Sequence, residues 1–299
     1  MKNVAAVVVT YNRKELLKEN IESLLSQTQK DILDIYVIDN ASTDGTEKEL
    51  QDYVNNEMIQ YVNTGANLGG AGGFHYGIKT AALKGYDYIW VMDDDCMPTP
   101  TALEEFLNMG CMLKGNYGYL SSKVLWKDGN ICNMNIQRKT MFKNLNDFES
   151  NMQKIAMASF VSLFIPINVI REVGLPIKEF FIWTDDWEYT RRVSLRYPCY
   201  YVPKSVVIHK SNSNIGANIV NDDISRLNRY DYLYRNDVYL YKREGISGYI
   251  YEIMRLSFHI TKVILRSENN KIARLSKILR GTFNGFSFNP SIEFLESKG

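Results

Sequence analysis

This chain of 299 residues is poor in several features that would quickly assign a protein to a class. Its four cysteines, Cys96, Cys111, Cys132 and Cys199, form no Cys-x-x-Cys pair, which argues against a disulfide framework and predicts reduced thiols in a cytosolic protein. A formal net charge of only +1 gives no global field toward nucleic acid. No uninterrupted apolar run approaches the length of a membrane span, and the strand expected next to Met1 leaves no signal peptide.

What is present indicates a folded α/β protein. Hydrophobic residues make up 45% of the chain, enough for a sizeable core, and the length suits one large domain with or without an appendage. Short apolar runs alternate with helical patterns in the first half, which predicts a doubly wound, mostly parallel sheet. Strands are expected at 4–10, 35–38, 59–62 and from Tyr88, with helices at 14–27, 46–56 and 69–84. Beyond residue 99 we expect helices at 101–113 and 184–196, strands at 117–126, 159–165 and 206–209, and a polar excursion at 127–155.

Three consecutive carboxylates, Asp93, Asp94 and Asp95, follow the predicted buried strand that begins at Tyr88. Like charges at a strand end repel one another and are costly to bury, so a bound cation commonly holds such a cluster. Oxygen ligands suit Mg²⁺ or Mn²⁺. A solvated acidic turn explains these three residues equally well when they are taken alone.

The ends of the predicted strands bring this cluster together with two other residues. Ligands of doubly wound sheets bind at the carboxyl ends of the strands. Thr10, Asp39 and Asp93 all lie at such ends. We therefore expect the three residues to share one crevice.

The segments Val7–Arg13, Val37–Thr46 and Asp93–Asp95, in this order and spacing, resemble the nucleotide-binding half of family-two inverting glycosyltransferases with the GT-A fold. The resemblance extends over about residues 4–210. It implies an enzyme that takes a sugar from a nucleotide-sugar donor with the help of Mn²⁺ or Mg²⁺.

The resemblance and the chemistry of the side chains together indicate a donor site. Asp39 can accept a hydrogen bond from the uracil N3–H, although an aspartate there can equally cap the following turn. Thr10 and Tyr11 are expected at the base or ribose, or in a turn. Arg13 is expected to pair with a phosphate, or only to begin a helix, and Asp94 is assigned to nucleotide-sugar binding.

The same resemblance implies a metal site formed by Asp93, Asp95 and His209. A lone histidine at the end of a strand is more often structural than a ligand. The family, however, places a metal-binding histidine after the helix that carries its base, and imidazole is a good partner for Mn²⁺. His209 follows such a helix, so we assign it to the metal.

Residues 180–189 place an aromatic run before the acids Asp185, Asp186 and Glu188. Acids in a first helical turn can serve simply as helix caps. Inverting sugar transfer needs a base, and crowded carboxylates raise one another's pKa values. The segment resembles the family motif Trp-Asp-Asp-x-Glu-Tyr, which implies that Asp186 is the base. Trp183 and Trp187 are expected to stack on the acceptor, with burial in the core as the alternative.

A glycine-rich segment, Asn67–Phe74, opens the helix predicted at 69–84. Consecutive glycines allow close approach of a ligand, and free N–H groups at a helix start bind anions. We therefore assign Asn67, Gly69 and Gly70 to the donor site, with a flexible loop as the alternative. The segment is similar to that of galactofuranosyltransferases within the family, which favours UDP-galactofuranose as the donor.

The last part of the chain is basic. Between Arg255 and Arg280 there are seven Lys or Arg residues and a single acid, Glu268, on one or two helices predicted over 248–280. Such a surface can bind anionic lipid peripherally or can be an ordinary solvated face. The first interpretation predicts salt-sensitive adsorption to anionic vesicles, little binding to neutral ones, and a loss when Lys262, Arg266 and Arg274 are reversed in charge.

The sequence as a whole predicts a GT-A domain over 1–215 and a helical, basic extension over 216–299. The expected function is inverting, metal-dependent transfer of a sugar, foremost galactofuranose, to a bacterial surface glycan, with a glycan or lipid-linked glycan as acceptor. The alternatives are a rhamnosyltransferase using dTDP-rhamnose, a nucleotidyltransferase, and a non-catalytic nucleotide-sugar or glycan-binding module. We expect a cytoplasmic location, which the inner face of the cell membrane would also satisfy.

Overall fold

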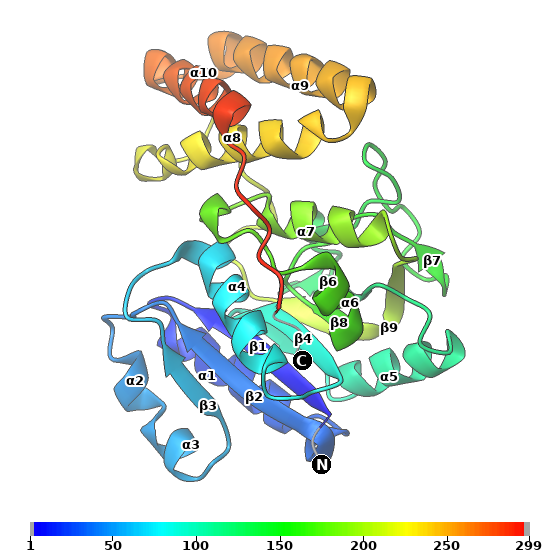
Figure 1. The fold of residues 1–299 in the computed structure, drawn as a ribbon. Coiled ribbons are helices and arrows are strands. Elements are labelled where there is room, and N and C mark those ends of the chain that lie inside the picture. The colour runs from blue at the N-terminus through cyan, green and yellow to red at the C-terminus, as the bar shows by residue number, and fades with distance from the viewer. Residues whose placement is uncertain (1–2, 296–299) are drawn as a thin grey trace.

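A computed structural model describes residues 3–295 and shows one mixed sheet with helices on both faces, below a group of three C-terminal helices (Figure 1). The strand order is β3-β2-β1-β4-β8-β6-β9-β5, and β7 pairs with β9. The strands are β1 Val4–Thr10, β2 Leu33–Asp39, β3 Gln60–Asn63, β4 Tyr88–Asp93, β5 Cys96–Pro98, β6 Leu120–Trp126, β7 Gln153–Lys154, β8 Leu163–Pro166 and β9 Tyr200–His209.

The helices of the first two-thirds of the chain alternate with these strands. They are α1 Lys14–Leu25, α2 Thr46–Glu49, α3 Gln51–Asn55, α4 Gly69–Ala82, α5 Ala102–Met112, α6 Ile167–Val173 and α7 Asp185–Ser194. Strands β3, β2, β1 and β4 run parallel, whereas β8 is antiparallel to both β4 and β6. The prediction of a doubly wound, mostly parallel sheet is confirmed.

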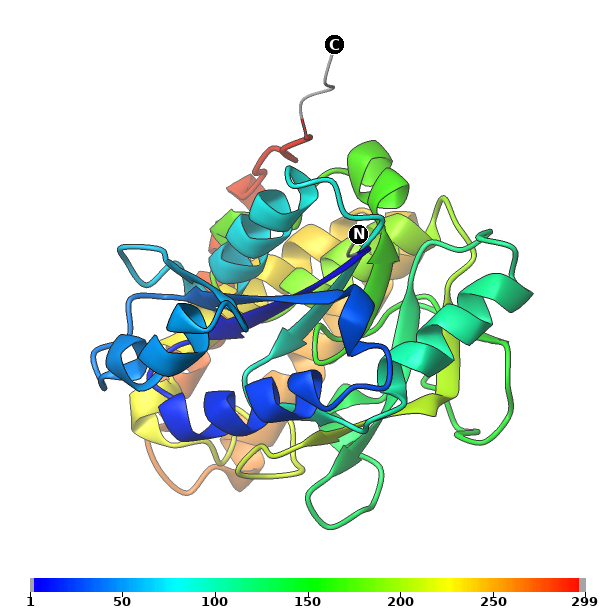
Figure 2. The same ribbon diagram turned by 90° about the horizontal axis from the view of Figure 1, so that it is seen from below.

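Strand β1 explains why the sheet needs helices on both faces. All seven of its residues are buried. Val4, Ala6 and Val8 pack toward α1 and α5, while Val7 and Val9 on the other face pack toward α4. Figure 2 shows α1 and α5 from below, across the first of these faces. An uninterrupted apolar run is the pattern of a strand covered on both sides.

Two predicted elements differ from those observed. The helix expected at 46–56 is two short helices, because the chain breaks at fully buried Leu50. The strand expected at 206–209 is the end of the longer β9. Opposite β6, the register of β9 jumps from Val202 to Val206. Pro203, which has no N–H to donate, lies within this irregularity and obscures the strand in the sequence.

Three helices complete the chain: α8 Arg229–Lys242, α9 Gly245–Arg266 and α10 Lys271–Ser287. Helix α8 lies between the sheet domain and the pair α9–α10, which packs side by side on its far side (Figure 1). Tyr230, Tyr234 and Val238 of α8 are buried at helical spacing. The helical extension is thereby confirmed, while the domain boundary near residue 215 stays a prediction.

Part of the basic character of the extension is used in contacts within the fold, and binding to anionic lipid stays a prediction. Arg274 is buried and donates to backbone carbonyl oxygens of the segment before α8. Arg255 is held in ion pairs with acids of α8 and α9, and Lys277 and Arg280 pair with Asp231. Within residues 3–295, the cations of this stretch that have no ion-pair partner are Lys262, Arg266, Lys271 and Arg274, of which Arg274 is buried. None of the helices in that range is long and apolar enough to cross a membrane.

Candidate active site

The carboxyl ends of β1, β2 and β4 meet at one edge of the sheet. Thr10 lies opposite Asp39 in the register of β1 and β2, and Val9 lies opposite Asp93. The Thr10 hydroxyl also donates to Asp94 Oδ2 at 2.7 Å. The structure thus gathers the three strand-end residues that the sequence places in one crevice.

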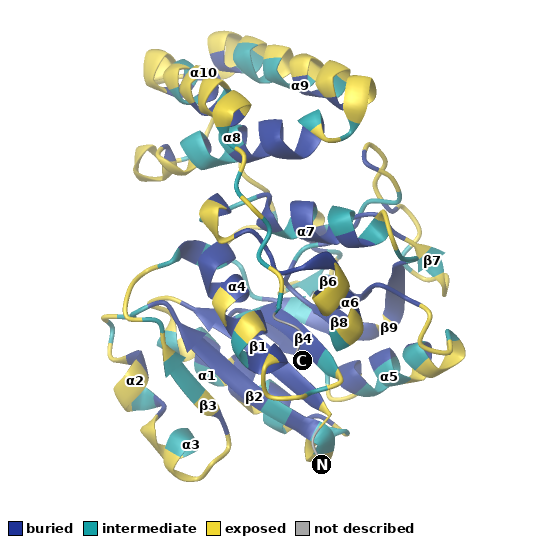
Figure 3. Cartoon of the chain, viewed as in Figure 1, coloured by how far each residue is buried: buried dark blue, intermediate teal, exposed yellow. Residues whose placement is uncertain are grey.

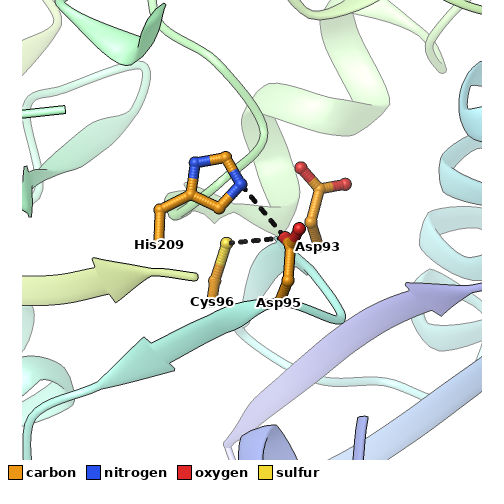
Figure 4. Close-up of side chains that lie close together, drawn as sticks. All are labelled: Asp93, Asp95, Cys96 and His209. Carbon is orange, nitrogen blue, oxygen red and sulfur yellow. Dashed lines mark hydrogen bonds and ion pairs between the residues drawn. The ribbon is translucent and has the colours of Figure 1, made fainter. Parts of the chain in front are cut away.

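Four side chains at this edge bring potential metal-ligand atoms within 4.8 Å of one another: Asp93, Asp95, Cys96 and His209 (Figure 4). His209 ends β9, whose antiparallel partner β5 places it directly opposite Cys96. His209 Nε2 lies 3.1 Å from Asp95 Oδ1. Sheet pairing therefore joins a histidine from late in the sequence to the aspartate cluster.

The donor atoms of this cluster fit Mn²⁺ or Mg²⁺. Asn135 Oδ1 lies 2.8 Å from His209 Nδ1, and this contact orients the ring so that Nε2 faces the carboxylates. The Cys96 thiol donates to Asp95 Oδ1 at 3.8 Å, and sulfur is a poorer ligand than oxygen or imidazole for Mn²⁺ or Mg²⁺. Two carboxylates and one imidazole nitrogen remain as ligands. Asn135 lies in the polar excursion at 127–155 and carries no motif in the sequence.

Arg13 places a positive charge against two carboxylates of the cluster. Arg13 Nη1 lies 2.6 Å from Asp95 Oδ2 and 3.3 Å from Asp94 Oδ1. Burial raises the pKa of Asp93 to about 6 and that of Asp94 to about 7. Burial also acts upward on Asp95, but the hydrogen bond and charge of His209, with Arg13, hold its pKa below the usual value. Asp95 is therefore the carboxylate most firmly kept as an anion.

Helix α7 opens with the candidate base. Asp185 is buried and Asp186 is half-buried, and Asp186 Oδ1 accepts from the backbone N–H of Trp187 at 2.7 Å. Burial, then the charge of Asp185 and that of Asp93, raises the pKa of Asp186 well above its usual value. Burial likewise raises the pKa of Asp185 to about 7. Hydrogen bonds link α7 to the acidic edge of the sheet: Thr190 Oγ1 accepts from the Ala158 N–H, and Asn135, the partner of His209, donates to Ser159 Oγ. The charge of Asp93 also contributes to the raised pKa of both aspartates.

The third predicted acid of α7, Glu188, is already paired. Its two carboxylate oxygens accept from Arg192 at 2.9 Å and 3.0 Å. Glu188 is almost fully buried, so this bidentate pair satisfies it within the helix. The observed pairing indicates a structural position for Glu188 and does not support the catalytic role predicted from the sequence.

The turn before α7 is held in an unusual conformation by α8. Phe181, Trp183 and Thr184 have positive φ angles of 64°, 65° and 67°. Buried Asn236 of α8 donates to the carbonyl oxygens of Phe180, Ile182 and Trp183 at 2.9–3.1 Å. The Thr184 hydroxyl donates to Asp237 Oδ1 at 2.7 Å.

Asn236 and Asp237 therefore act as positioning residues for the candidate base. Strained backbone persists only where its surroundings stabilise it. The hydrogen bonds of these two side chains stabilise the turn before α7. Sequence reasoning missed both of them. The feature of the sequence that could have indicated them is that Asn236 and Asp237 are adjacent polar residues within the tyrosine-rich segment 230–241.

The two tryptophans offered as acceptor platforms are half-buried and have ring neighbours in the protein. The Trp183 ring packs edge-on against Tyr230, with centroids 5.2 Å apart. The Arg138 guanidinium lies 4.0 Å from the centroid of Trp187. One face of Trp187 is thus occupied, and acceptor stacking stays a prediction for both residues.

The predicted base-binding residue, Asp39, is buried and accepts two hydrogen bonds from the protein. Tyr61 donates to Oδ2 at 2.6 Å, and the Ser42 N–H donates to Oδ1 at 2.8 Å. A carboxylate has about four acceptor positions, so these two bonds do not use up its capacity to accept one from a uracil N3–H. Nearby Tyr11 is exposed. These two residues keep their predicted roles as expectations.

The glycines at the start of α4 serve chiefly to let the protein pack on itself. A Cβ at Gly69 would overlap the carbonyl oxygen of Phe181, and one at Gly73 would come within 2.5 Å of Val9. The N–H of Gly69 donates to Asn67 Oδ1 at 2.9 Å, and that of Ala71 to the Phe181 carbonyl at 3.2 Å. The expectation of a first turn with free N–H groups for an anion is therefore wrong for these two amides.

Replacing Gly69 tests this close packing. We expect Gly69→Ala to lower the free energy of unfolding by about 2 kcal/mol or more, because φ is +73° and the new methyl group meets the Phe181 carbonyl. Gly70 is the matched control, since a Cβ there has no heavy atom within 4 Å. Urea unfolding of both variants is the measurement. Equal stability of the two variants would contradict the packing.

The fold and the acidic edge define an α/β domain of the GT-A type. Solved structures share this architecture. The mannosyltransferase PcManGT from Pyrobaculum calidifontis, in complex with GDP-Man and Mn²⁺, matches with TM-score 0.58 and 14% identity, over 97% of this chain and 76% of that one. S. aureus TarS with UDP-GlcNAc matches with TM-score 0.54 and 14% identity, over 96% and 75%. At these identities the likeness concerns the fold alone.

Residues 5–114 match the model of Glycosyl transferase family 2. This part of the chain thus matches the family-two glycosyltransferases, and the chain is similar to galactofuranosyltransferases. GlfT1 of Mycolicibacterium smegmatis is 27% identical over 208 residues, which are 64% of this chain and 65% of that protein. The match thus spans just under two-thirds of that relative's length. The abequosyltransferase RfbV of Salmonella typhimurium is 35% identical over 95 residues, 31% of this chain and 28% of that protein.

Proposed function

We propose that this protein is an inverting, metal-dependent glycosyltransferase that moves galactofuranose from UDP-galactofuranose to a bacterial surface glycan. The observation that carries the proposal is the meeting of two acidic groups. The cluster around Asp93 and Asp95 lies at the sheet edge, and the charge of Asp93 contributes to the raised pKa of Asp185 and Asp186 at the start of α7. The cluster around Asp93 and Asp95 would serve the leaving diphosphate, and the pair Asp185 and Asp186 would serve the attacking hydroxyl.

Asp93, Asp95 and His209 would hold the metal ion. When bound, Mn²⁺ or Mg²⁺ supplies positive charge that stabilises a leaving diphosphate. The contact of Asn135 with His209 Nδ1 keeps the other ring nitrogen facing this position. Arg13, held against Asp94 and Asp95, adds a permanent positive charge at the same edge.

Asp186 would take the proton from the acceptor hydroxyl. A general base works best when its pKa lies near the working pH, and burial beside Asp185 moves the pKa of Asp186 upward in that direction. The first turn of α7 is fixed by the hydrogen bonds of Asn236 and Asp237 to the preceding turn. That hold would keep the base in place while donor and acceptor bind.

The donor assignment rests on similarity together with the strand-end carboxylate Asp39. The matched relative GlfT1 is named a galactofuranosyltransferase, and TarS binds UDP-GlcNAc in its crystal structure. Thr10, Tyr11 and Asp39 lie where a uridine would be expected at the ends of β1 and β2. The packing role of Gly69 removes one reason for choosing galactofuranose, so the similarity carries more of the assignment.

Donor hydrolysis tests the donor assignment directly. With Mn²⁺ present, we expect nucleotide release from UDP-galactofuranose to exceed that from dTDP-rhamnose several-fold. UDP-galactopyranose is the control that separates recognition of the sugar ring from recognition of the nucleotide. A several-fold preference for dTDP-rhamnose would replace the proposal with the rhamnosyltransferase alternative. Release from none of the donors, with binding retained, would indicate a non-catalytic nucleotide-sugar module.

The acceptor is proposed to be a glycan attached to a lipid carrier. This places the protein in the cytoplasm, at the inner face of the cell membrane. The proposal is supported by the extent of apolar surface on the C-terminal helices, which lies apart from the acidic cluster.

A further inference from the structure

Helix α9 turns an apolar face to the outside. Ile246 is 80% exposed, and six other large apolar side chains along the helix are at least half exposed. They are Ile250, Ile253, Met254, Phe258, Ile264 and Leu265. The interspersed exposed residues on this face include Ser257 and Thr261, whereas the charged residues of α9 are buried or half-buried except Arg266 at its end. This reverses the usual pattern of a surface helix, whose apolar stripe faces the core.

Helix α10 adds a second apolar stripe. Ile272 is 85% exposed, and Leu279, Phe283 and Phe286 follow it at spacings of 7, 11 and 14 residues, which return to one side of a helix. The two helices contact each other and lie side by side beyond α8 (Figure 1). Figure 3 shows their outer sides as exposed, while α8 beneath them is largely buried.

We call the exposed apolar residues of the two helices the outer face. Its members are Ile246, Ile250, Ile253, Met254, Phe258, Ile264 and Leu265 of α9 and Ile272, Leu279, Phe283 and Phe286 of α10. Scattered single apolar residues on a surface are ordinary, but a gathered apolar surface of this kind marks an interaction site.

The charges around the outer face indicate which kind of partner it binds. Lys262, Arg266 and Lys271 lie on the same two helices without acidic partners among the described residues. Helix α10 contains no acid at all, and the acid of α9, Glu252, is buried against Arg255. A two-fold dimer through the outer face would bring like charges of both copies together, because such an interface uses the same patch twice. An anionic lipid surface instead complements these cations.

We propose that the outer face of α9 and α10 inserts into the interfacial layer of a membrane that contains anionic lipid. Helices with one apolar side and flanking cations lie in the plane of this layer, with the apolar side chains among the acyl chains. Binding by burial of apolar surface depends little on ionic strength, whereas attraction by exposed charges is screened. Insertion therefore differs from a purely electrostatic contact. The protein should stay bound to the membrane at high salt, and the cations should only strengthen the binding.

A pocket beside α9 reaches α8, the helix that holds the turn before α7. A pocket of about 300 Å³ lies between α9, α8 and residues 215–220, and Lys262 and His259 of α9 are part of its wall. Tyr230 of α8 lines the same pocket and contacts Trp183, close to the start of α7. A lipid-linked acceptor held at the membrane would thus meet α8, the helix that positions the base. This link rests on the proposed function, whereas insertion itself does not.

The test is co-sedimentation of the full chain with phosphatidylcholine vesicles, with and without phosphatidylglycerol, at low and at high salt. The parent protein is expected to bind the anionic vesicles at both salt concentrations. Ile253→Ser with Phe283→Ser, one exposed position on each helix, should weaken binding about tenfold or more by removing apolar area. Leu195→Ser, equally exposed but at the end of α7, is the matched control and should bind like the parent.

Several results would overturn the proposal. Loss of all binding at high salt would show that exposed charges alone hold the protein on the vesicle. Equal binding by the double variant and the parent would show that the outer face does not contact the lipid. A concentration-dependent dimer of the parent, lost in the double variant, would assign the face to a second copy. Ile250→Ser with Leu279→Ser repeats the test should the first pair reduce folding, as judged by circular dichroism. Nucleotide release without vesicles, measured on every variant, keeps failure of docking distinct from failure of the proposed enzyme activity.

Discussion

Asp186→Asn is expected to lower kcat by about 10²-fold or more while leaving the affinity for the donor largely intact. Asparagine keeps the shape of the side chain and the hydrogen bond from the Trp187 N–H, but it cannot accept a proton from the acceptor hydroxyl. Single-turnover transfer and donor binding, measured separately, distinguish this loss from a weakened donor site.

Asp185→Asn is the matched control for the base. Asp185 neighbours Asp186 and raises its pKa, so we expect this variant to shift the pH dependence of transfer more than its maximal rate. A base must be deprotonated to act. Because the pKa of Asp186 is raised, activity of the parent should increase with pH above the usual aspartate range, and removal of the Asp185 charge should move that rise to lower pH. A crippled Asp185→Asn with a near-normal Asp186→Asn would reverse the assignment within the pair.

Loss of the metal site is expected to have a still larger effect. Asp93→Ala or Asp95→Ala should reduce transfer by about 10³-fold or more, because a metal ion stabilises charge on the leaving group by several kcal/mol. Excess EDTA should reproduce the loss in the parent protein, and added Mn²⁺ should reverse it. Full activity in EDTA would exclude the metal from the mechanism.

Two controls sharpen the metal experiment. Asn135→Ala leaves the three ligands in place but removes the partner of His209 Nδ1, so we expect weaker Mn²⁺ binding with activity recovered at high Mn²⁺. Cys96→Ser tests the fourth side chain of the cluster. Because Mn²⁺ prefers oxygen and imidazole ligands to sulfur, this change should leave the affinity for Mn²⁺ nearly unaltered.

Much of the sheet was predictable because local pattern and tertiary environment agree there. Residues 4–9 of β1 are all apolar and buried, so both faces of this strand lie in the core. Parallel pairing with β2 and β4 then places the polar residues at the ends of these strands along one edge of the sheet. The aspartates at the strand ends could therefore be grouped without knowing the structure. Element limits were less predictable where burial or proline interrupts the pattern, as at Leu50 and Pro203.

The C-terminal helices show the limit of a charge count. The sequence contains seven basic residues between Arg255 and Arg280, but it does not show which of them meet an acid or a carbonyl oxygen. Folding buries Arg274 and pairs Arg255 within the domain. The apolar residues that the same pattern would assign to a core are left outside. Two helices packed on a third can bury only part of their apolar surface.

The sequence by itself determined the alternation of strands and helices, the acidic strand end at Asp93–Asp95 and the adjoining acids that open α7, because these depend on short-range periodicity and residue chemistry. Only the tertiary structure decided which distant groups meet. Antiparallel pairing of β5 with β9 brings His209 to the aspartates, and packing of α8 against the turn before α7 brings in Asn236. It also decided that Gly69 faces Phe181. Such contacts join residues from different elements and turns, and their partners are set by how the elements pack, which no local pattern encodes.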